Sequence, residues 1–162
     1  MLRLGSHDDF DALYPIYMHR KVNPYLSFEI MSKELFRPIF DQLINSGTLF
    51  VYEQPAGHIA ATCIARRGQR RCAHVVCLST LATDPTCHRQ GVGSTFVRDL
   101  IAHLAKDKQV KRIELYAEAD NDIALKFYQK LGFHIEGCLR KYYKRADDSE
   151  AVDELILGML LD

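Results

Sequence analysis

One short segment of this 162-residue sequence combines two glycines with the start of a predicted helix. It reads His88-Arg89-Gln90-Gly91-Val92-Gly93-Ser94 and follows an extended stretch that ends in Leu81-Ala82-Thr83. Glycine lets a backbone approach a ligand closely, and the first N–H groups of a helix have no acceptor within that helix. Together with the helix dipole, such N–H groups attract an anion. The segment therefore predicts a site for a phosphate or pyrophosphate group.

Two familiar phosphate-binding motifs do not fit this segment. A dinucleotide-binding fingerprint needs a third glycine where Phe96 stands, and a P-loop needs a Gly-Lys-Ser/Thr sequence that is absent. Taken alone, Gly91 and Gly93 are equally consistent with a helix start that is merely capped or packed, because short glycine motifs match by chance.

A second segment, residues 120–133, places Asn121 and Tyr128 on one predicted helix. Their spacing is about two turns at roughly 1.5 Å per residue, so both side chains can face one site. A tyrosine hydroxyl can donate a proton and an asparagine amide can hydrogen-bond a ligand. The alternative roles are a core aromatic beside Ala124 and Leu131 for the tyrosine, and a helix cap for the asparagine.

Both segments resemble motifs of the GNAT superfamily of N-acetyltransferases. Residues 85–94 are similar to its motif A, Arg/Gln-x-x-Gly-x-Gly/Ala, with His88 in the first position. Residues 120–133 are similar to its motif B, Asn-x-x-Ala-x-x-hydrophobic-Tyr-x-x-x-Gly-Phe. In this sequence, as in the superfamily, one strand separates motif A from motif B. The predicted order of helices and strands is also that of the superfamily, so the resemblance covers nearly the whole chain.

The resemblance implies acetyl-CoA as co-substrate and Tyr128 as the general acid that protonates the departing thiolate. N–H groups at Leu81 to Thr83 would polarise the thioester carbonyl, and Asn121 would bond the pantetheine arm. The implied cofactor-binding residues are Leu81, Ala82, Thr83, His88, Arg89, Gln90, Gly91, Val92, Gly93, Ser94, Asn121 and Tyr128.

The general base that takes a proton from the amine is left open by the sequence. Some members of the superfamily carry a glutamate five residues before the motif B asparagine, a position held here by Tyr116. Glu114 and Glu118 share its strand face by period-two alternation, so either could serve directly or through water. More distant candidates are Glu29 and His74.

The acceptor is expected to be a primary amine, attacked directly in a ternary complex. Asn23, Tyr25, Ser27 and Glu29 lie between the first two predicted helices, where the superfamily commonly lines its acceptor pocket. An ordinary surface loop is the alternative for this stretch. The resemblance implies a free amino acid or another small-molecule amine as acceptor. Two alternatives stay open: a protein N-terminal acetyltransferase of the ribosomal-protein type, and a non-catalytic acyl-CoA-binding sensor.

The elements that must position these residues alternate between extended and helical patterns. We expect an α/β (α+β) GNAT fold in a single N-acetyltransferase domain over residues 1–162. Its central sheet is mixed, mostly antiparallel and twisted, with about seven strands, about four helices and strands splayed at the acetyl-CoA site. Strands are predicted at Leu2–Leu4, Leu49–Tyr52, His58–Arg66, Ala73–Ala82, Arg112–Ala117, Phe133–Lys144 and Val152–Leu161, and helices near Phe10–Tyr17, Ser32–Ile44, Gly91–Leu104 and Asp120–Leu131.

Composition limits the classes of partner. The 21 Lys and Arg balance 21 Asp and Glu, so neither nucleic acid nor an anionic membrane is expected, and a homodimer is compatible with this composition. The five cysteines include no C-x-x-C pair, which indicates neither a disulfide framework nor a thiolate zinc site, and no metal is expected. The first residues lack a signal-like apolar region, and no apolar run reaches roughly 18 residues. We therefore expect a soluble, cytoplasmic protein.

Overall fold

The computed structural model describes residues 1–161. Their contacts divide the chain into two compact units. The first unit contains residues 1–65 and 80–99, and the second contains residues 66–79 and the chain from residue 100 onward. The predicted anion-binding loop thus belongs to the first unit, whereas Asn121 and Tyr128 belong to the second.

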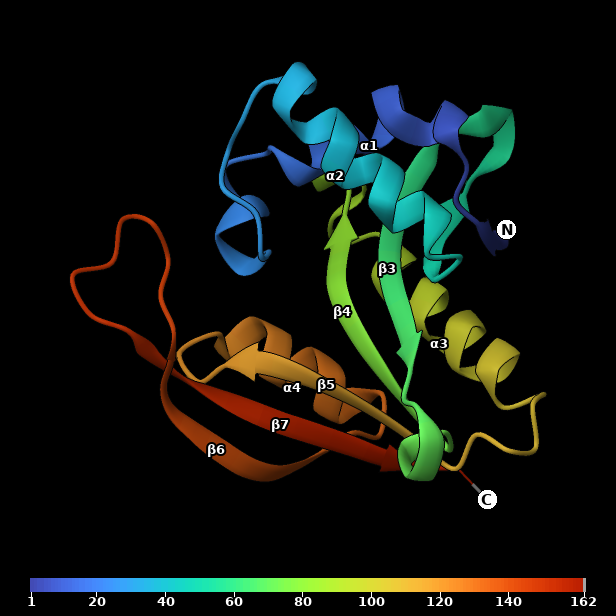
Figure 1. Cartoon of the computed structure of the whole chain (residues 1–162), viewed down its shortest axis with the longest axis vertical. Coiled ribbons are helices and arrows are strands. Elements are labelled where there is room, and N and C mark those ends of the chain that lie inside the picture. Colours follow the sequence, from blue (N-terminus) through green and yellow to red (C-terminus); the bar gives the residue numbers. More distant parts are fainter. Residues whose placement is uncertain (162) are drawn as a thin grey trace. The chain divides into compact units, whose positions relative to one another are not determined.

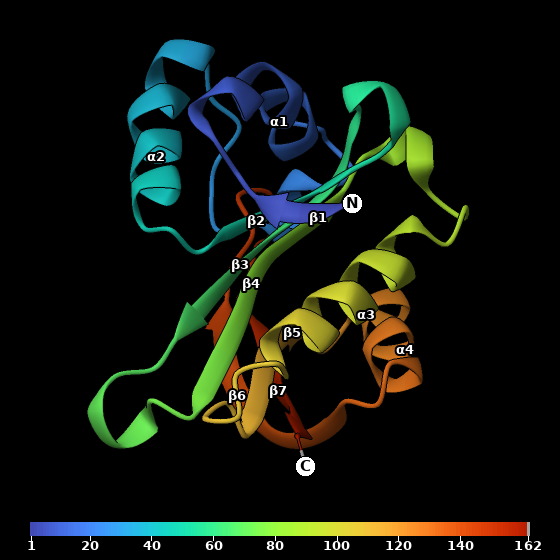
Figure 2. The same cartoon turned by 90° about the vertical axis from the view of Figure 1, so that its right-hand side faces the viewer.

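The described residues form seven strands and four α-helices (Figures 1 and 2). The strands are β1 (Leu2–Leu4), β2 (Leu49–Glu53), β3 (Ile59–Arg67), β4 (Val75–Thr83), β5 (Arg112–Glu118), β6 (His134–Tyr143) and β7 (Val152–Leu160). The helices are α1 (Phe10–Tyr17), α2 (Lys33–Asn45), α3 (Val92–Leu104) and α4 (Asp122–Lys130). Every predicted strand and helix is present, and their ends differ from the prediction by a few residues.

The strands form one sheet in the order β1-β2-β3-β4-β5-β7-β6. The pairs β1–β2, β2–β3, β5–β7 and β6–β7 are antiparallel, whereas β4 and β5 are parallel. The β4–β5 register runs from Val75↔Arg112 to Leu78↔Leu115 and ends there, although both strands continue. Thr80 follows with a left-handed φ of 52°. These observations confirm the mixed sheet and the expected splaying of its strands.

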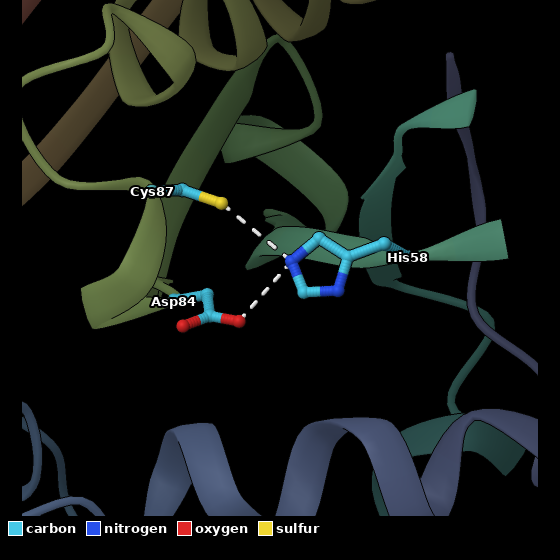
Figure 3. A group of neighbouring side chains, drawn as sticks. All are labelled: His58, Asp84 and Cys87. Atoms are coloured by element: carbon cyan, nitrogen blue, oxygen red, sulfur yellow. Dashed lines mark hydrogen bonds and ion pairs between the residues drawn. The ribbon is translucent and has the colours of Figure 1, made fainter. Parts of the chain in front are cut away.

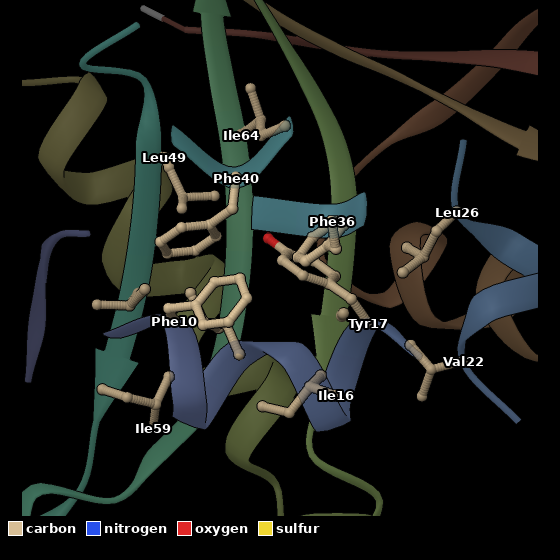
Figure 4. Packing of buried hydrophobic residues seen from close by; sticks show 13 residues of the cluster. Phe10, Ile16, Tyr17, Val22, Leu26, Phe36, Phe40, Leu49, Ile59 and Ile64 are labelled. Carbon is tan, nitrogen blue, oxygen red and sulfur yellow. The ribbon is translucent and has the colours of Figure 1, made fainter. Parts of the chain in front are cut away.

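The core of the first unit lies under two helices. The apolar residues of α1 recur at helical spacing, and Phe10 and Tyr17 are both buried. On α2, whose first turn is capped by Ser32 Oγ accepting from Leu35 N–H, Phe36 and Phe40 are fully buried. The Phe10 and Phe40 rings meet edge to face, with centroids 5.2 Å apart (Figure 4). Aromatic packing therefore holds α1 and α2 side by side.

The core of the second unit follows from the alternation of β5. Ile113, Leu115 and Ala117 are buried, as expected of every second residue in a strand. Leu157 of β7, which faces Leu115 in the register, is also fully buried. At the end of α4, Phe133 N–H donates to the Tyr128 carbonyl at 3.1 Å, which ties the helix end to the approach to β6.

Some predicted strand ends lie inside turns. The strand predicted from Ala73 begins at Val75, because residues 70–72 form a 3-10 turn that starts at Arg70 with φ 53°. No disulfide joins the five cysteines, all of which lie within the described chain. Within residues 1–161, none of the helices has a stretch long and apolar enough to cross a bilayer.

Candidate active site

The anion-binding loop leads from β4 into α3. The first backbone bond of the helix runs from Thr95 N–H to the Gly91 carbonyl at 3.0 Å. The N–H groups of Val92, Gly93 and Ser94 precede it and have no backbone acceptor among residues 1–161. Gly91 has a φ of 78°, a conformation that glycine adopts without strain. Free N–H groups at the positive end of a helix dipole fit the pyrophosphate of acetyl-CoA.

Polar side chains of the loop hold its shape. His88 Nε2 lies 3.2 Å from the Thr83 carbonyl, and Gln90 Nε2 donates to the Thr86 carbonyl at 2.9 Å. Both side chains are exposed, as is Arg89, whose φ is 61°. Of the residues that end β4, Leu81 and Thr83 are half-buried and Ala82 is buried in the core. The predicted cofactor-binding residues of the first unit therefore form one continuous strand, turn and helix start.

In the second unit, Asn121 is the N-cap of α4. Its Oδ1 accepts from Ala124 N–H at 3.1 Å, and its Nδ2 donates weakly to Glu118 Oε2 at 3.4 Å. The cap that the sequence left as an alternative is therefore present, and a contact with the pantetheine arm stays a prediction. Tyr128 is half-buried, with its ring edge to face against Phe133 at 6.0 Å. Its role as general acid also stays a prediction.

The two candidate bases on β5 have different surroundings. Glu114 accepts a hydrogen bond from Arg112 Nε at 2.9 Å, so an adjacent cation neutralises its charge. Glu118 is only 5% exposed and stands directly opposite Glu154 of β7 in the antiparallel register. Glu114 is thus paired with a cation, whereas Glu118 is buried beside a second carboxylate, and the choice of base between them stays a prediction.

Glu154 is a residue that sequence reasoning missed. The residue is 9% exposed, and its carboxylate has no hydrogen bond or ion pair with another side chain of the described chain. Burial and the neighbouring Glu118 carboxylate raise the pKa of Glu154 above its usual range. Burial and the Glu118 charge also raise the pKa of Tyr143. Because Glu154 belongs to an acidic run near the chain end, its sequence context resembles a solvated surface, and only the strand register reveals the pair.

The residues predicted to line the acceptor pocket differ in exposure. Asn23 is buried, and its Nδ2 donates to the carbonyls of Tyr17 and Phe28 at 3.0 and 2.9 Å. The amide therefore holds this loop in shape. Tyr25, Ser27 and Glu29 are exposed, as is His74 at the approach to β4. Tyr116, at the position where some superfamily members carry a glutamate, is 40% exposed.

Comparisons with known proteins identify the family of this chain. The model of the acetyltransferase (GNAT) family matches residues 10–133. The L-amino acid N-acetyltransferase AaaT of Escherichia coli K12 is 38% identical over 94% of this chain and 93% of its own. The ribosomal protein bS18-alanine N-acetyltransferase of the same strain is 34% identical over 51% of this chain and 53% of its own. The crystal structure of the Escherichia coli ribosomal-protein-S18-alanine N-acetyltransferase superimposes with a TM-score of 0.74 at 25% identity, over 100% of this chain and 94% of that one.

Proposed function

This chain belongs to the acetyltransferase (GNAT) family, whose members transfer an acetyl group to an amine. We propose that the acceptor of this enzyme is the α-amino group of a free amino acid. The relative whose name describes L-amino acid acetylation is similar over 94% of this chain, whereas the match to the ribosomal-protein enzyme spans 51%. This difference in coverage favours a small acceptor over a protein N-terminus, which remains the second candidate.

The observation that carries the proposal is the carboxylate pair Glu118 and Glu154. The two side chains face each other across β5 and β7, and Asn121 bonds Glu118 at the start of α4. Along the same helix stands Tyr128. The second unit thus provides both a buried carboxylate that can take up a proton and a hydroxyl that can supply one. An amine arrives as a cation, which a buried carboxylate attracts.

The proposed reaction uses acetyl-CoA, which supplies the acyl group as a thioester. The N–H groups of Val92 to Ser94 hold its pyrophosphate, and N–H groups at Leu81 to Thr83 polarise its carbonyl. Glu118 takes a proton from the acceptor ammonium and so frees the nitrogen lone pair for attack. Tyr128 donates the hydroxyl proton to the departing sulfur. The attacking nitrogen gives up its second proton as the amide forms, and proton exchange with solvent restores the Tyr128 hydroxyl. Glu118 releases its own proton to solvent, so one proton is released for each amide formed.

An acceptor panel tests the proposal. Release of free CoA would be measured with L-amino acids, with the corresponding amino-acid amides, with short peptides and with simple alkylamines. The expected result is a highest kcat/KM for a free amino acid. Preference for a peptide N-terminus would replace the proposal with the second candidate. If acetyl-CoA raises the Tm but no acceptor causes CoA release, the chain binds acyl-CoA without turnover.

A further inference from the structure

Three potential metal ligands meet in the first unit, whereas the carboxylate pair belongs to the second. His58 Nε2 lies 3.2 Å from Asp84 Oδ2 and 3.5 Å from Cys87 Sγ. The three donor atoms all lie within 4.8 Å of one another. In Figure 3 the imidazole points from the approach to β3 toward the turn that carries the other two side chains. His58 is remote in sequence from Asp84 and Cys87, and the site contains one cysteine, so cysteine spacing did not indicate a metal.

This arrangement does not suit nucleophilic catalysis. In a triad, the imidazole contacts the nucleophile with one ring nitrogen and the carboxylate with the other. Here the thiol and the carboxylate both face Nε2. One nitrogen cannot donate a hydrogen bond to Asp84 and also accept the proton of Cys87. A cation at the meeting point satisfies all three groups together.

Two of the three donor separations match one tetrahedral ion. Zinc bonds are about 2.0–2.1 Å to nitrogen, 2.0–2.2 Å to oxygen and 2.3 Å to sulfur. At a tetrahedral angle they place nitrogen about 3.6 Å from sulfur and about 3.4 Å from oxygen. The observed separations are 3.5 and 3.2 Å, and the Asp84 and Cys87 donors lie within 4.8 Å of each other. We propose that His58, Asp84 and Cys87 bind a zinc-like divalent transition metal. The thiol loses its proton to solvent on binding, and the imidazole binds through Nε2 with its proton on Nδ1.

Surrounding contacts orient these ligands. Asp84 Oδ1 accepts from both the N–H and the hydroxyl of Thr86 at 2.8 Å, which leaves Oδ2 for the metal. Cys87 is 6% exposed and packs in an apolar cluster, whereas the His58 side chain is 46% exposed and provides the route of entry. Gln54 Oε1, 3.8 Å from Cys87 Sγ, or a water can complete the coordination. Such outer contacts are typical of metal sites.

Bound metal would join the approach to β3 to the turn immediately before the anion-binding loop. Asp84 precedes that turn, Pro85–Cys87, Cys87 is its last residue, and His88 follows it directly. The metal would therefore act as a clip that stabilises this part of the first unit, independently of the reaction proposed above.

Cobalt substitution tests the site. Chelator-treated protein would be titrated with Co²⁺, and we expect a thiolate-to-cobalt charge-transfer absorption that saturates at one equivalent and disappears when Zn²⁺ is added. Cys87→Ser should abolish this band, whereas Cys72→Ser, which removes an exposed thiol elsewhere, should retain it. Because Cys87 is buried, His58→Gln at an exposed position provides a second variant, expected to weaken Zn²⁺ binding at least tenfold.

Thermal unfolding gives a second readout. Free Zn²⁺ at about a hundredfold excess over Kd should raise the Tm of the wild type by about 5–10 °C. Mg²⁺ should have no such effect, because it disfavours sulfur ligands. Absence of the cobalt band in the wild type, or its persistence in folded Cys87→Ser, would show that the cluster is only a hydrogen-bonded ion pair and would overturn the proposal.

Discussion

Glu118 and Glu154 stand directly opposite each other on β5 and β7, and both residues are buried. Like charges at opposed positions destabilise an antiparallel pair, and burial adds a desolvation cost to each charge. A nonpolar or amide residue at either position would favour folding. The pair is therefore expected to cost stability at neutral pH.

Replacing Glu154 with glutamine should stabilise the protein at neutral pH. In the folded protein the pKa of Glu154 is raised above the unfolded value of about 4.3. The contribution of Glu154 to the free energy of unfolding is therefore most favourable below about pH 4.3, and it is lost as the pH rises through the folded pKa. Glu154→Gln should therefore raise the Tm at pH 7 by about 2–4 °C, corresponding to about 1 kcal/mol, with the gain shrinking toward pH 4. Thermal melts across this pH range measure the effect.

The matched control for this prediction is Glu150→Gln. Glu150 is exposed and pairs with Lys141 at 3.4 Å, so its loss should change the Tm little at any pH. If Glu154→Gln were less stable than the wild type at pH 7, burial and the Glu118 charge could not be the cause of the raised pKa.

Glu118 and Glu114 should respond differently to the same substitution. Glu118→Gln removes the proposed base and should lower kcat/KM about 10²–10³-fold. Glu114→Gln removes a carboxylate already paired with Arg112 and should leave kcat/KM within about threefold of the wild type. Steady-state CoA release with the best acceptor measures both. The reverse order of effects would assign the base to Glu114.

Tyr128→Phe should separate chemistry from folding. The substitution keeps the ring contacts with Phe127 and Phe133, so the Tm should change by only a few degrees. Loss of the proton donor should lower kcat at least about 100-fold, with little change in the KM for acetyl-CoA. Tyr142→Phe is the control, because Tyr142 is 66% exposed. Full activity of Tyr128→Phe would rule out the acid role.

Gly91→Ala tests the anion-binding loop, and Gly47→Ala is its matched control. Both glycines have positive φ, 78° and 65°, and an added Cβ meets nothing within 4 Å at either site. Backbone strain alone should therefore lower the free energy of unfolding of each variant by about 1 kcal/mol, so the Tm should fall by a similar amount in both. Only Gly91→Ala should also raise the KM for acetyl-CoA several-fold. An equal KM for acetyl-CoA in the two variants would show that the pyrophosphate does not bind at the Gly91 loop.

Much of the fold could be predicted because its signals are local. Helical spacing of apolar residues identified α1 and α2, and Ser32 was a recognisable cap. The glycines at the start of α3 and the asparagine at the start of α4 marked both motifs, since a turn conformation and a helix cap depend on a few consecutive residues. The strand ends were less predictable: Arg70 adopts a left-handed conformation in a turn where the sequence has no glycine.

What the sequence determined by itself is the order of the elements, the family resemblance and the residue types of the anion-binding loop, all of which are carried by neighbours along the chain. Tertiary structure alone decided two other features. Strand register placed Glu154 opposite Glu118, and a turn brought Cys87 and Asp84 to His58. Charge repulsion, burial and metal coordination depend on distances between side chains that are remote in sequence, so no local pattern contains them.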